Sequence, residues 1–401
     1  MTVRVPIEGG ITAPKGFRAA GVAAGIKKAP KKDVGLIVFE PGTVTSAVFT
    51  RNAMAAAPIV VSRRHLAEGS IRAIVANSGN ANACTGDEGV ADAIETARAV
   101  AREIGVAPQD VLVASTGVIG EPLDMASIEL GVREAAGRLG PNSFHFAEAI
   151  MTTDTFPKEI AVEASIAGGP VRIGGVAKGS GMIQPDMATM LAFLTTDADL
   201  EKAHLQALLA DVAERSFNML TVDGETSTND MVALSASGRS ALRIEPGNES
   251  EEIFRELLLF VCTELARMIA RDGEGATKLV DVTVTGAASA VEAKTAAMAV
   301  ANSPLVKTAL FASDPNWGRI AQAAGASPAR LDPKALSISF GDIVVAKQGQ
   351  GVDFDEARAG DYLKGKQIAV YVDLGVGESE ATVWTCDFSY DYVKINAEYR
   401  T

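Results

Sequence analysis

Short apolar runs alternate with helical patterns along almost the whole chain, and this alternation constrains the fold more than any other feature. Runs rich in β-branched residues are typical of strands, whereas apolar residues spaced three and four apart predict helices. The expected strands include 35–39, 70–75 and 111–114. The expected helices span about 90–104, 205–212 and 251–271. The sequence therefore predicts a mixed α and β protein.

Three local signals refine this prediction. The stretch Ser115-Thr116-Gly117 is expected to break the strand before it, and Ser303-Pro304 is expected to cap and begin a helix. Near the C-terminus, residues 368–372 and 381–386 are expected to form two strands joined as a hairpin by a Gly-rich turn. Long helices together with antiparallel strands favour a layered α+β fold over a doubly wound parallel sheet.

The length and charge of the chain limit its function. A chain of 401 residues exceeds one small core, so two domains or one large layered unit is expected. The formal net charge is -13 at pH 7, and an acidic surface repels phosphate backbones and anionic lipids. We find no signal-peptide pattern and no apolar run approaching the roughly 18 residues that a membrane helix needs. The expectation is a cytoplasmic protein that acts on small molecules, without nucleic-acid or membrane partners.

Common catalytic and metal-binding motifs are absent. The three histidines have neither His-Glu-x-x-His spacing nor a neighbouring Cys pair, so no metal site is expected. No Gly-x-Ser-x-Gly elbow occurs. The cysteines Cys84, Cys262 and Cys386 are odd in number and far apart, and we expect reduced, buried thiols.

The segment 174–193 has an unusual composition. Several glycines, Lys178 and Pro185 precede Thr189, which opens an apolar run typical of a strand. Local physics predicts a sharply turned loop that leads into a buried strand. From spacing alone, a surface loop with a structural threonine is the more economical interpretation.

Longer motifs, in a fixed order, change that interpretation. The run KGSGMIQPDMATMLAF at 178–193 resembles the processing site of the ornithine acetyltransferases, the ArgJ family of arginine biosynthesis. Further matches to the family occur at 75–86, 114–120, 150–158, 221–230, 271–278 and 313–320. The resemblance covers most of the chain. It implies a layered α/β/β/α-type sandwich like that of the N-terminal-nucleophile hydrolases.

The resemblance implies that the chain cleaves itself between Ala188 and Thr189. The products would be an α chain, residues 1–188, and a β chain, residues 189–401, that together form one intertwined catalytic unit. Family members assemble as α2β2 or larger. The new α-amino group of Thr189 would act as the base for the hydroxyl of the same residue, because terminal amines titrate near pKa ~7.7–8.0.

The remaining site residues also follow from the resemblance. Thr116 and Gly117 would form the oxyanion hole. The substrate-binding residues implied by the resemblance are Thr152, Lys178, Thr189, Glu274, Asn396 and Thr401. Lys178 and Glu274 carry the charges that a zwitterionic substrate requires, although charge alone does not assign which end each binds. Thr153 stands beside Thr152 in the same motif and is the alternative ligand. Asn396 and Thr401 imply that the C-terminus folds back into the site.

The implied reaction transfers acetyl from N2-acetyl-L-ornithine to L-glutamate by a ping-pong mechanism through acetyl-Thr189, with no cofactor. Some family members also take acetyl from acetyl-CoA, and the sequence leaves open whether this chain does. One alternative is a related N-terminal-nucleophile amidohydrolase or aminopeptidase, which would pass the acyl group to water. The other is an uncleaved amino-acid-binding protein that has lost activity.

Overall fold

A computed structural model describes residues 4–28, 30–184 and 190–398. These residues form two compact units. The described parts of the first unit are 4–179, 190–218 and 226–265, and those of the second are 180–184, 219–225 and 266–398.

The first unit contains two sheets. The six-stranded sheet has the order β1-β7-β8-β9-β10-β4, and the four-stranded sheet has the order β2-β3-β5-β6. Most neighbours are antiparallel, but β5 and β6 are parallel, as are β9 and β10. The strands are β1 (Arg4–Ile7), β2 (Phe17–Val22), β3 (Val34–Phe39), β4 (Val44–Phe49), β5 (Ala73–Asn80), β6 (Val111–Val118), β7 (Lys158–Ile166), β8 (Gly169–Lys178), β9 (Leu191–Thr196) and β10 (Met231–Ala236).

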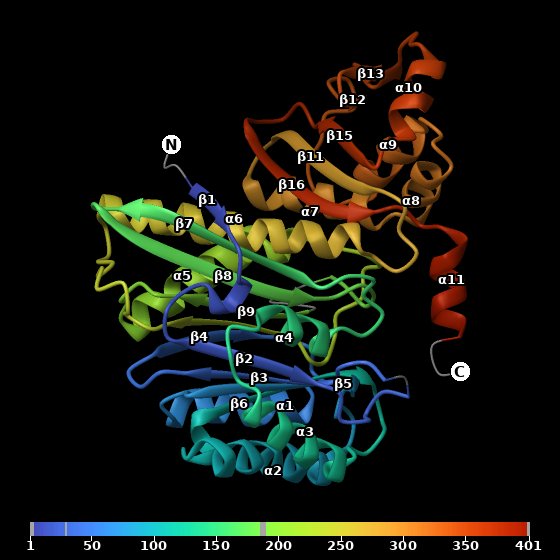
Figure 1. Ribbon diagram of the computed structural model, residues 1–401. Helices are drawn as coiled ribbons and strands as arrows, with labels where there is room; N and C mark the ends of the chain where they lie inside the picture. The colour runs from blue at the N-terminus through green and yellow to red at the C-terminus, as the bar shows by residue number, and fades with distance from the viewer. Residues whose placement is uncertain (1–3, 29, 185–189, 399–401) are drawn as a thin grey trace. The chain divides into compact units, whose positions relative to one another are not determined.

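Helices cover the outer faces of both sheets, so the first unit has four layers in the order α/β/β/α (Figure 1). Helices α2 and α3 pack on the four-stranded sheet, and α5 and α6 pack on the six-stranded sheet. The helices of this unit are α1 (Ala57–Glu68), α2 (Gly86–Ile104), α3 (Met125–Gly137), α4 (Ser143–Ile150), α5 (Lys202–Arg215) and α6 (Glu249–Arg271), the last only as far as Leu265, with 3-10 turns Gly10–Thr12, Pro108–Asp110 and Phe217–Met219. The layered sandwich inferred from the resemblance is confirmed.

Burial on both faces explains why β3 is continuously apolar. Ile37 and Phe39 point into the core between the sheets, whereas Leu36 and Val38 point toward α2 and α3. On the other sheet, α6 lies so close to β8 that a Cβ atom at Gly175 would be 2.8 Å from the side chain of Leu265. Small residues therefore permit the close layers.

The second unit is built on a six-stranded sheet in the order β14-β13-β12-β15-β11-β16. Its strands are β11 (Leu279–Ala287), β12 (Ser337–Phe340), β13 (Ile343–Lys347), β14 (Gln350–Gly351), β15 (Gln367–Asp373) and β16 (Ser379–Cys386). Its helices are α7 (Ala290–Asn302), α8 (Pro304–Phe311), α9 (Trp317–Ala326), α10 (Glu356–Leu363) and α11 (Tyr390–Ala397), with the end of α6. The first four helices pack with the sheet around one apolar core. Ser303 caps α8 as expected, since its side chain accepts a hydrogen bond from the amide of Val306.

Three expectations from the sequence were wrong. Strands β15 and β16 do not form a hairpin, because β11 lies between them and pairs with both. Strand β6 does not break at Ser115 but continues through Gly117 to Val118, since β5 extends alongside it. Cys262 and Cys386 are buried, but Cys84 is exposed in the turn after β5. No described helix is long and apolar enough to cross a membrane.

Candidate active site

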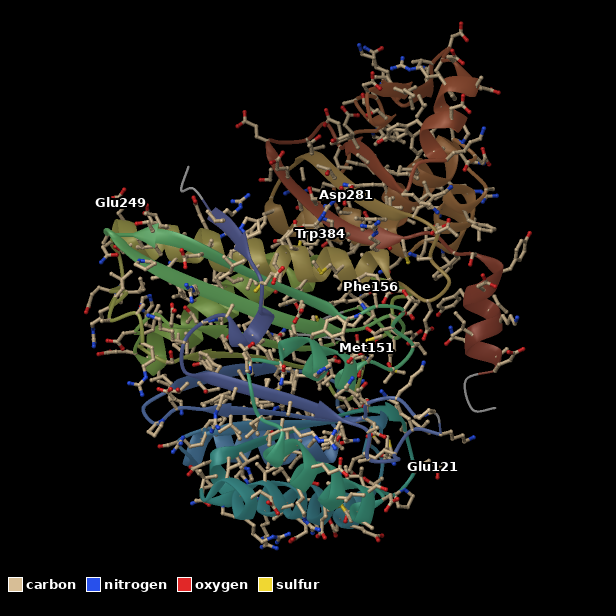
Figure 2. All side chains as sticks on the ribbon, viewed as in Figure 1. Glu121, Met151, Phe156, Glu249, Asp281 and Trp384 are labelled. Carbon is tan, nitrogen blue, oxygen red and sulfur yellow. The ribbon has the colours of Figure 1, made fainter. Side chains whose placement is uncertain are left out.

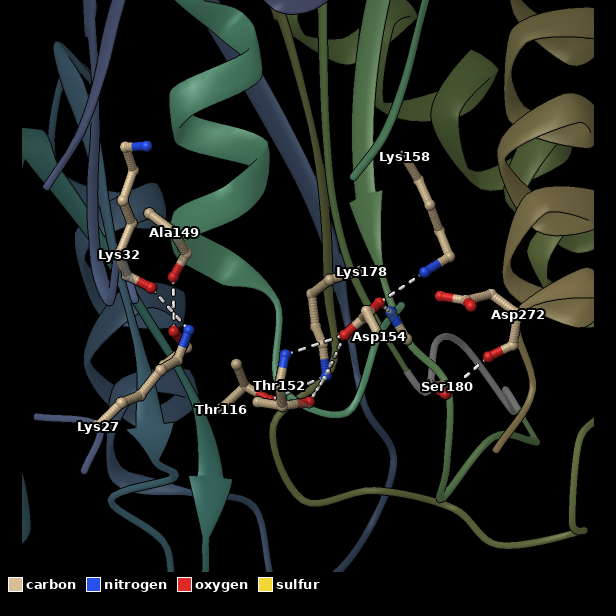
Figure 3. Close-up of polar contacts among 12 residues, drawn as sticks. Lys27, Lys32, Thr116, Ala149, Thr152, Asp154, Lys158, Lys178, Ser180 and Asp272 are labelled. Atoms are coloured by element: carbon tan, nitrogen blue, oxygen red, sulfur yellow. Dashed lines mark hydrogen bonds and ion pairs between the residues drawn. The ribbon is translucent and has the colours of Figure 1, made fainter. Parts of the chain in front are cut away.

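Lys178, the last residue of β8, is the centre of the candidate site in the first unit. Its side chain is buried, and its ammonium group donates hydrogen bonds to the hydroxyl of Thr152 (2.8 Å) and to that of Thr116 (3.2 Å). Figure 3 shows these three side chains converging from separate parts of the chain. The structure therefore brings together three of the residues that the resemblance assigned.

Asp154 holds Lys178 from the opposite side. One carboxylate oxygen lies 4.0 Å from Nζ of Lys178 and accepts a hydrogen bond from the amide of Thr152 (2.9 Å). The other oxygen accepts from Nζ of Lys158 (2.6 Å) and from the amide of Gly179 (2.8 Å). This single carboxylate thus joins the loop after α4 to the end of β8. Figure 2 labels Met151 and Phe156 in that loop.

The charge of Asp154 is maintained despite its burial. Burial by itself raises the pKa of this carboxyl group, but the ammonium groups of Lys158 and Lys178 outweigh that effect and hold the pKa well below its usual range. The pair formed by Asp154 and Lys158 is completely buried. The charge of Asp154 therefore orients the ammonium group of Lys178 within the protein interior.

The proposed oxyanion residues Thr116 and Gly117 lie near the end of β6. Gly117 pairs with Gly79 of β5 and has a φ of 139°, which L-residues with side chains rarely adopt. A Cβ atom here would lie 2.3 Å from the carbonyl carbon of Gly79 and 2.5 Å from the amide nitrogen of Asn80. Only glycine fits at this position.

Buried amide side chains support this end of β6. Asn229 donates hydrogen bonds to the carbonyl oxygens of Ser115 (2.9 Å) and Ala81 (2.6 Å), and the hydroxyl of Ser115 donates to Asn77 (2.6 Å). Each of these polar groups is buried with a partner, so the network fixes the backbone that leads into Thr116.

Asp230 is a second buried carboxyl group in this unit. Burial raises its pKa well above the usual range, although hydrogen bonds from Ser227 and Thr50, the amide of Met190 and the charge of Lys178 oppose the shift. Its Oδ2 atom has no hydrogen-bond partner among the described residues. This carboxyl group lies beside Met190, the residue that follows Thr189 in the chain.

Glu274 and Asn396 come together in the second unit. The side-chain nitrogen Nδ2 of Asn396, on α11, donates a hydrogen bond to the buried Glu274 carboxylate (2.8 Å). Gly181 lies so close that a Cβ atom there would be 2.3 Å from Cδ of Glu274. The Ser389 hydroxyl donates to the carbonyl of Gly275 (2.6 Å) and thereby fastens the start of α11 to the loop that carries Glu274.

The segment 180–184 is also fixed within the second unit. The carboxylate of Asp223 accepts hydrogen bonds from the amides of Met182 (2.7 Å) and Ile183 (2.8 Å), while the Ser180 hydroxyl donates to the carbonyl of Asp272 (2.6 Å). Ala188, Thr189 and Thr401 lie outside the described residues. Within the described part of the chain, no cluster of three or more His, Cys, Asp or Glu side chains could hold a metal ion.

The sequence alone gave no role to four residues of this site, namely Asp154, Lys158, Asn229 and Asp230. Asp154 and Lys158 stand inside the motif at 150–158, and Asn229 and Asp230 inside that at 221–230. Their position inside these motifs was the only feature of the sequence that could have pointed to a role for them. Nothing in their spacing distinguished a buried ion pair from a solvated surface.

The first unit is a four-layer α/β/β/α sandwich. Its buried Lys178 contacts two hydroxyl groups near the end of β6, where only glycine fits at position 117. This fold and this site define an α+β enzyme. A family model described as the ArgJ family matches residues 18–401, and the chain belongs to that family. The arginine biosynthesis bifunctional protein ArgJ of Symbiobacterium thermophilum is 51% identical over 399 residues, covering 98% of this chain and 99% of that protein.

Two further relatives agree. The protein of the same name from Synechocystis is 47% identical over 408 residues and covers 98% of both chains. A crystal structure of the ArgJ protein from Bacillus halodurans is 45% identical, with a TM-score of 0.52, and covers 53% of this chain and 100% of that one.

Proposed function

We propose that this chain is an acetyltransferase of arginine biosynthesis that transfers the acetyl group of N2-acetyl-L-ornithine to L-glutamate through Thr189. Membership of the ArgJ family carries the assignment to arginine biosynthesis. The contacts of Lys178 with Thr116 and Thr152 are the observation that supports the proposed site most directly.

Maturation comes first. The hydroxyl of Thr189 attacks the carbonyl carbon of Ala188, the peptide C–N bond breaks and an ester forms. Water then opens the ester, which frees the hydroxyl and leaves a carboxylate on Ala188. Strands β8 and β9 precede and follow this bond and are antiparallel neighbours, with Lys178 opposite Leu191. Their pairing supports the proposal that the fragments 1–188 and 189–401 stay together as one unit.

Acetyl transfer then uses the new terminus. The α-amino group of Thr189 takes the proton of its own hydroxyl, and Oγ attacks the acetyl carbonyl of the substrate. Donors at Thr116 and Gly117 stabilise the oxyanion; loss of one such donor costs about 100- to 1,000-fold in kcat in a comparable site. Ornithine leaves with the proton on its α-nitrogen. The α-amine of glutamate then attacks acetyl-Thr189 and forms N-acetylglutamate.

The charges of the site match the substrate. The α-carboxylate of acetylornithine is two bonds from the nitrogen that carries the acetyl group, so it must lie near the oxyanion donors. We assign it to Lys178, because this ammonium group contacts Thr116. Glu274, oriented by Asn396, has the charge to bind the side-chain ammonium. Thr152 is assigned as a substrate ligand in preference to Thr153, because its hydroxyl contacts Lys178.

Mass spectrometry of the intact protein tests the nucleophile. Wild type should give two species, residues 1–188 and 189–401, whereas Thr189→Ala should remain one chain. Thr308→Ala, which removes an exposed threonine hydroxyl from α8, is the matched control and should be cleaved normally. An uncut wild type would contradict the proposal.

Acceptor choice is tested separately. The cleaved enzyme should become 42 Da heavier on the 189–401 fragment when it is incubated with acetylornithine alone, as expected for about one acetyl group per nucleophile. Glutamate should remove this acetyl group as N-acetylglutamate, and initial-rate plots should give parallel lines. Release of acetate without a dependence on glutamate would instead identify an amidohydrolase.

Assembly and location are part of the same proposal. We propose a cytoplasmic enzyme made of at least two αβ units. Light scattering of the cleaved protein should give at least twice the mass of one chain, 41.6 kDa. A mass equal to one αβ unit would contradict this part.

A further inference from the structure

Helix α11 depends on a few side-chain contacts for its position in the second unit. It spans eight residues, and none of these eight described residues is buried. A helix of this length is marginal in water without packing, so the contacts of its side chains decide where it lies. Tyr392 and Asn396, which are four residues apart and therefore on one face, make two of these contacts.

Tyr392 links α11 to Asp223. Its hydroxyl donates a hydrogen bond to Oδ2 of Asp223 (3.3 Å), and its ring stacks on that of Phe388, with the ring centroids 4.5 Å apart. Burial and the charges of Asp223 and Glu274 raise the pKa of Tyr392, so the hydroxyl keeps its proton at neutral pH. The hydroxyl of Tyr392 therefore remains a hydrogen-bond donor to the carboxylate.

Asp223 also holds the segment 180–184. Its carboxylate accepts hydrogen bonds from the consecutive amides of Met182 (2.7 Å) and Ile183 (2.8 Å). Met182 has a φ of 56°, a left-handed conformation that is uncommon for a residue with a side chain. Consecutive amides in such a turn form a concave site for an anion, and the carboxylate of Asp223 fills it. The conformation of this segment therefore depends on Asp223.

The segment 180–184 and helix α11 meet at Glu274. A Cβ atom at Gly181 would lie 2.3 Å from the carboxyl carbon of Glu274, and the amide of Glu274 donates a hydrogen bond to the carbonyl of Ser180 (2.9 Å). From α11, Nδ2 of Asn396 donates to the carboxylate of Glu274 (2.8 Å). Glu274 is thus contacted by two parts of the chain, and Asp223 forms hydrogen bonds with both of them.

We propose that Asp223 and Tyr392 are positioning residues that fix the carboxylate of Glu274 for the side-chain ammonium group of the substrate. This inference rests on the proposed function, in which Glu274 binds that ammonium group. Asp223 and Tyr392 act through Glu274 and do not contact the reacting atoms. A carboxylate that is already fixed loses less conformational entropy when it binds a cation, so affinity for the ammonium group depends on its position.

The test separates binding of the ammonium group from the integrity of the rest of the site. Tyr392→Phe removes the hydroxyl but keeps the ring that stacks on Phe388. Tyr390→Phe removes an exposed hydroxyl from the same helix and is the matched control. The probes are L-ornithine and L-norvaline, which has the same carbon chain without the side-chain amine. Titration calorimetry measures ornithine directly and norvaline by competition, and thermal unfolding shows that each variant is folded.

Wild type should bind ornithine more tightly than norvaline. Tyr392→Phe should bind ornithine about ten-fold more weakly, as expected for loss of a hydrogen bond to a charged group, and should bind norvaline as wild type does. Tyr390→Phe should match wild type with both probes. The inference is overturned if Tyr392→Phe binds ornithine normally, if both probes are weakened equally, or if the control behaves like Tyr392→Phe.

Asp223→Asn provides a second measurement. Asparagine keeps an oxygen acceptor but loses the charge, so this variant should also weaken ornithine binding more than norvaline binding. Because Asp223 and Tyr392 act through one contact, the double variant should weaken ornithine binding by less than the product of the two single effects. Multiplicative effects would show that the two residues act separately and would overturn the inference.

Acetyl transfer, measured with acetylornithine and glutamate, distinguishes this inference from the proposed function. A protein whose ornithine binding depends on Tyr392 but that transfers no acetyl group would contradict the proposed function and support the inference. A protein that transfers acetyl groups but binds ornithine independently of Tyr392 would overturn the inference alone.

Discussion

A carboxylate oxygen of Asp154 lies 2.6 Å from Nζ of Lys158, and both side chains are completely buried. The same carboxylate accepts hydrogen bonds from the amides of Thr152 and Gly179. Breaking a buried ion pair by removing one partner typically costs about 3–5 kcal/mol, because the other charge remains in the interior. The position of Lys178 therefore depends on the ion pair between Asp154 and Lys158, and breaking that pair would strongly destabilise the fold.

Asp154→Asn should destabilise the protein by about 3–5 kcal/mol, measured by urea unfolding at pH 7. Asp361→Asn, which removes an exposed partner of Lys364, is the control and should leave stability nearly unchanged. The pH dependence has a defined sign. Because the folded-state pKa of Asp154 is lowered, its stabilisation is present above the unfolded pKa and is lost as pH falls below about 4. The difference in unfolding free energy between wild type and Asp154→Asn should therefore become smaller below about pH 4. A difference that does not change with pH would argue against a charged Asp154.

Asp230 should behave in the opposite way. Its folded-state pKa is raised by burial, so the folded protein retains a proton that the unfolded chain loses. The contribution of Asp230 to the free energy of unfolding is therefore fully present below its unfolded-state pKa. It decreases as pH rises toward the pKa of Asp230 in the folded state. Asp230→Asn, which is neutral at every pH, should gain stability relative to wild type as pH rises above about 4, the unfolded pKa of an aspartate. The exposed Asp353→Asn should show no such trend in the same urea titrations, and a pH-independent effect of Asp230→Asn would refute the prediction.

Local patterns predicted the elements of this fold better than their pairing. The run at 35–39 is apolar because both faces of β3 are covered, and that can be read from the residues alone. Strand order cannot, because β11 enters between β15 and β16 from a distant part of the chain. The apparent hairpin was an error of this kind.

The site shows the same limit. The resemblance supplied Thr116, Thr152 and Lys178, and the structure brings their polar atoms within hydrogen-bond distance. Asp154 and Lys158 had no assigned role, because a charged pair four residues apart is normally solvated. Only the packing of the loop after α4 against β8 reveals that both side chains are buried.

Gly117→Ala should impair cleavage and acetyl transfer together. The added Cβ atom would meet the backbone of Gly79 and Asn80, which cannot move aside as a side chain could. We expect activity to fall at least about 100-fold, the effect of losing one oxyanion donor. Gly325→Ala, at the second-last residue of α9 with open space around it, should instead retain activity without a loss of stability. Normal cleavage of Gly117→Ala in a timed mass-spectrometric assay would remove Gly117 from the oxyanion assignment.

Gly181→Ala should affect binding more than folding. The new Cβ atom would lie 2.3 Å from the carboxyl carbon of Glu274, the end of a flexible side chain that can rotate away. Such rotation would break the hydrogen bond from Asn396 and would also turn the carboxylate away from the position proposed to bind the substrate ammonium group. The KM for acetylornithine should therefore rise about ten-fold, as expected for loss of a charge-assisted hydrogen bond, with little change in melting temperature.

Glu274→Gln and Asn396→Ala extend this prediction. Glu274→Gln retains the shape of the side chain but loses the charge, so it should raise the KM for acetylornithine as much as Gly181→Ala does. Asn396→Ala should have a smaller effect, because it removes only the residue that orients Glu274. Equal stability of all three variants in thermal unfolding, together with a larger KM, would place their effect at the substrate. A KM equal to that of wild type in Glu274→Gln would exclude Glu274 as the anion that binds the ammonium group.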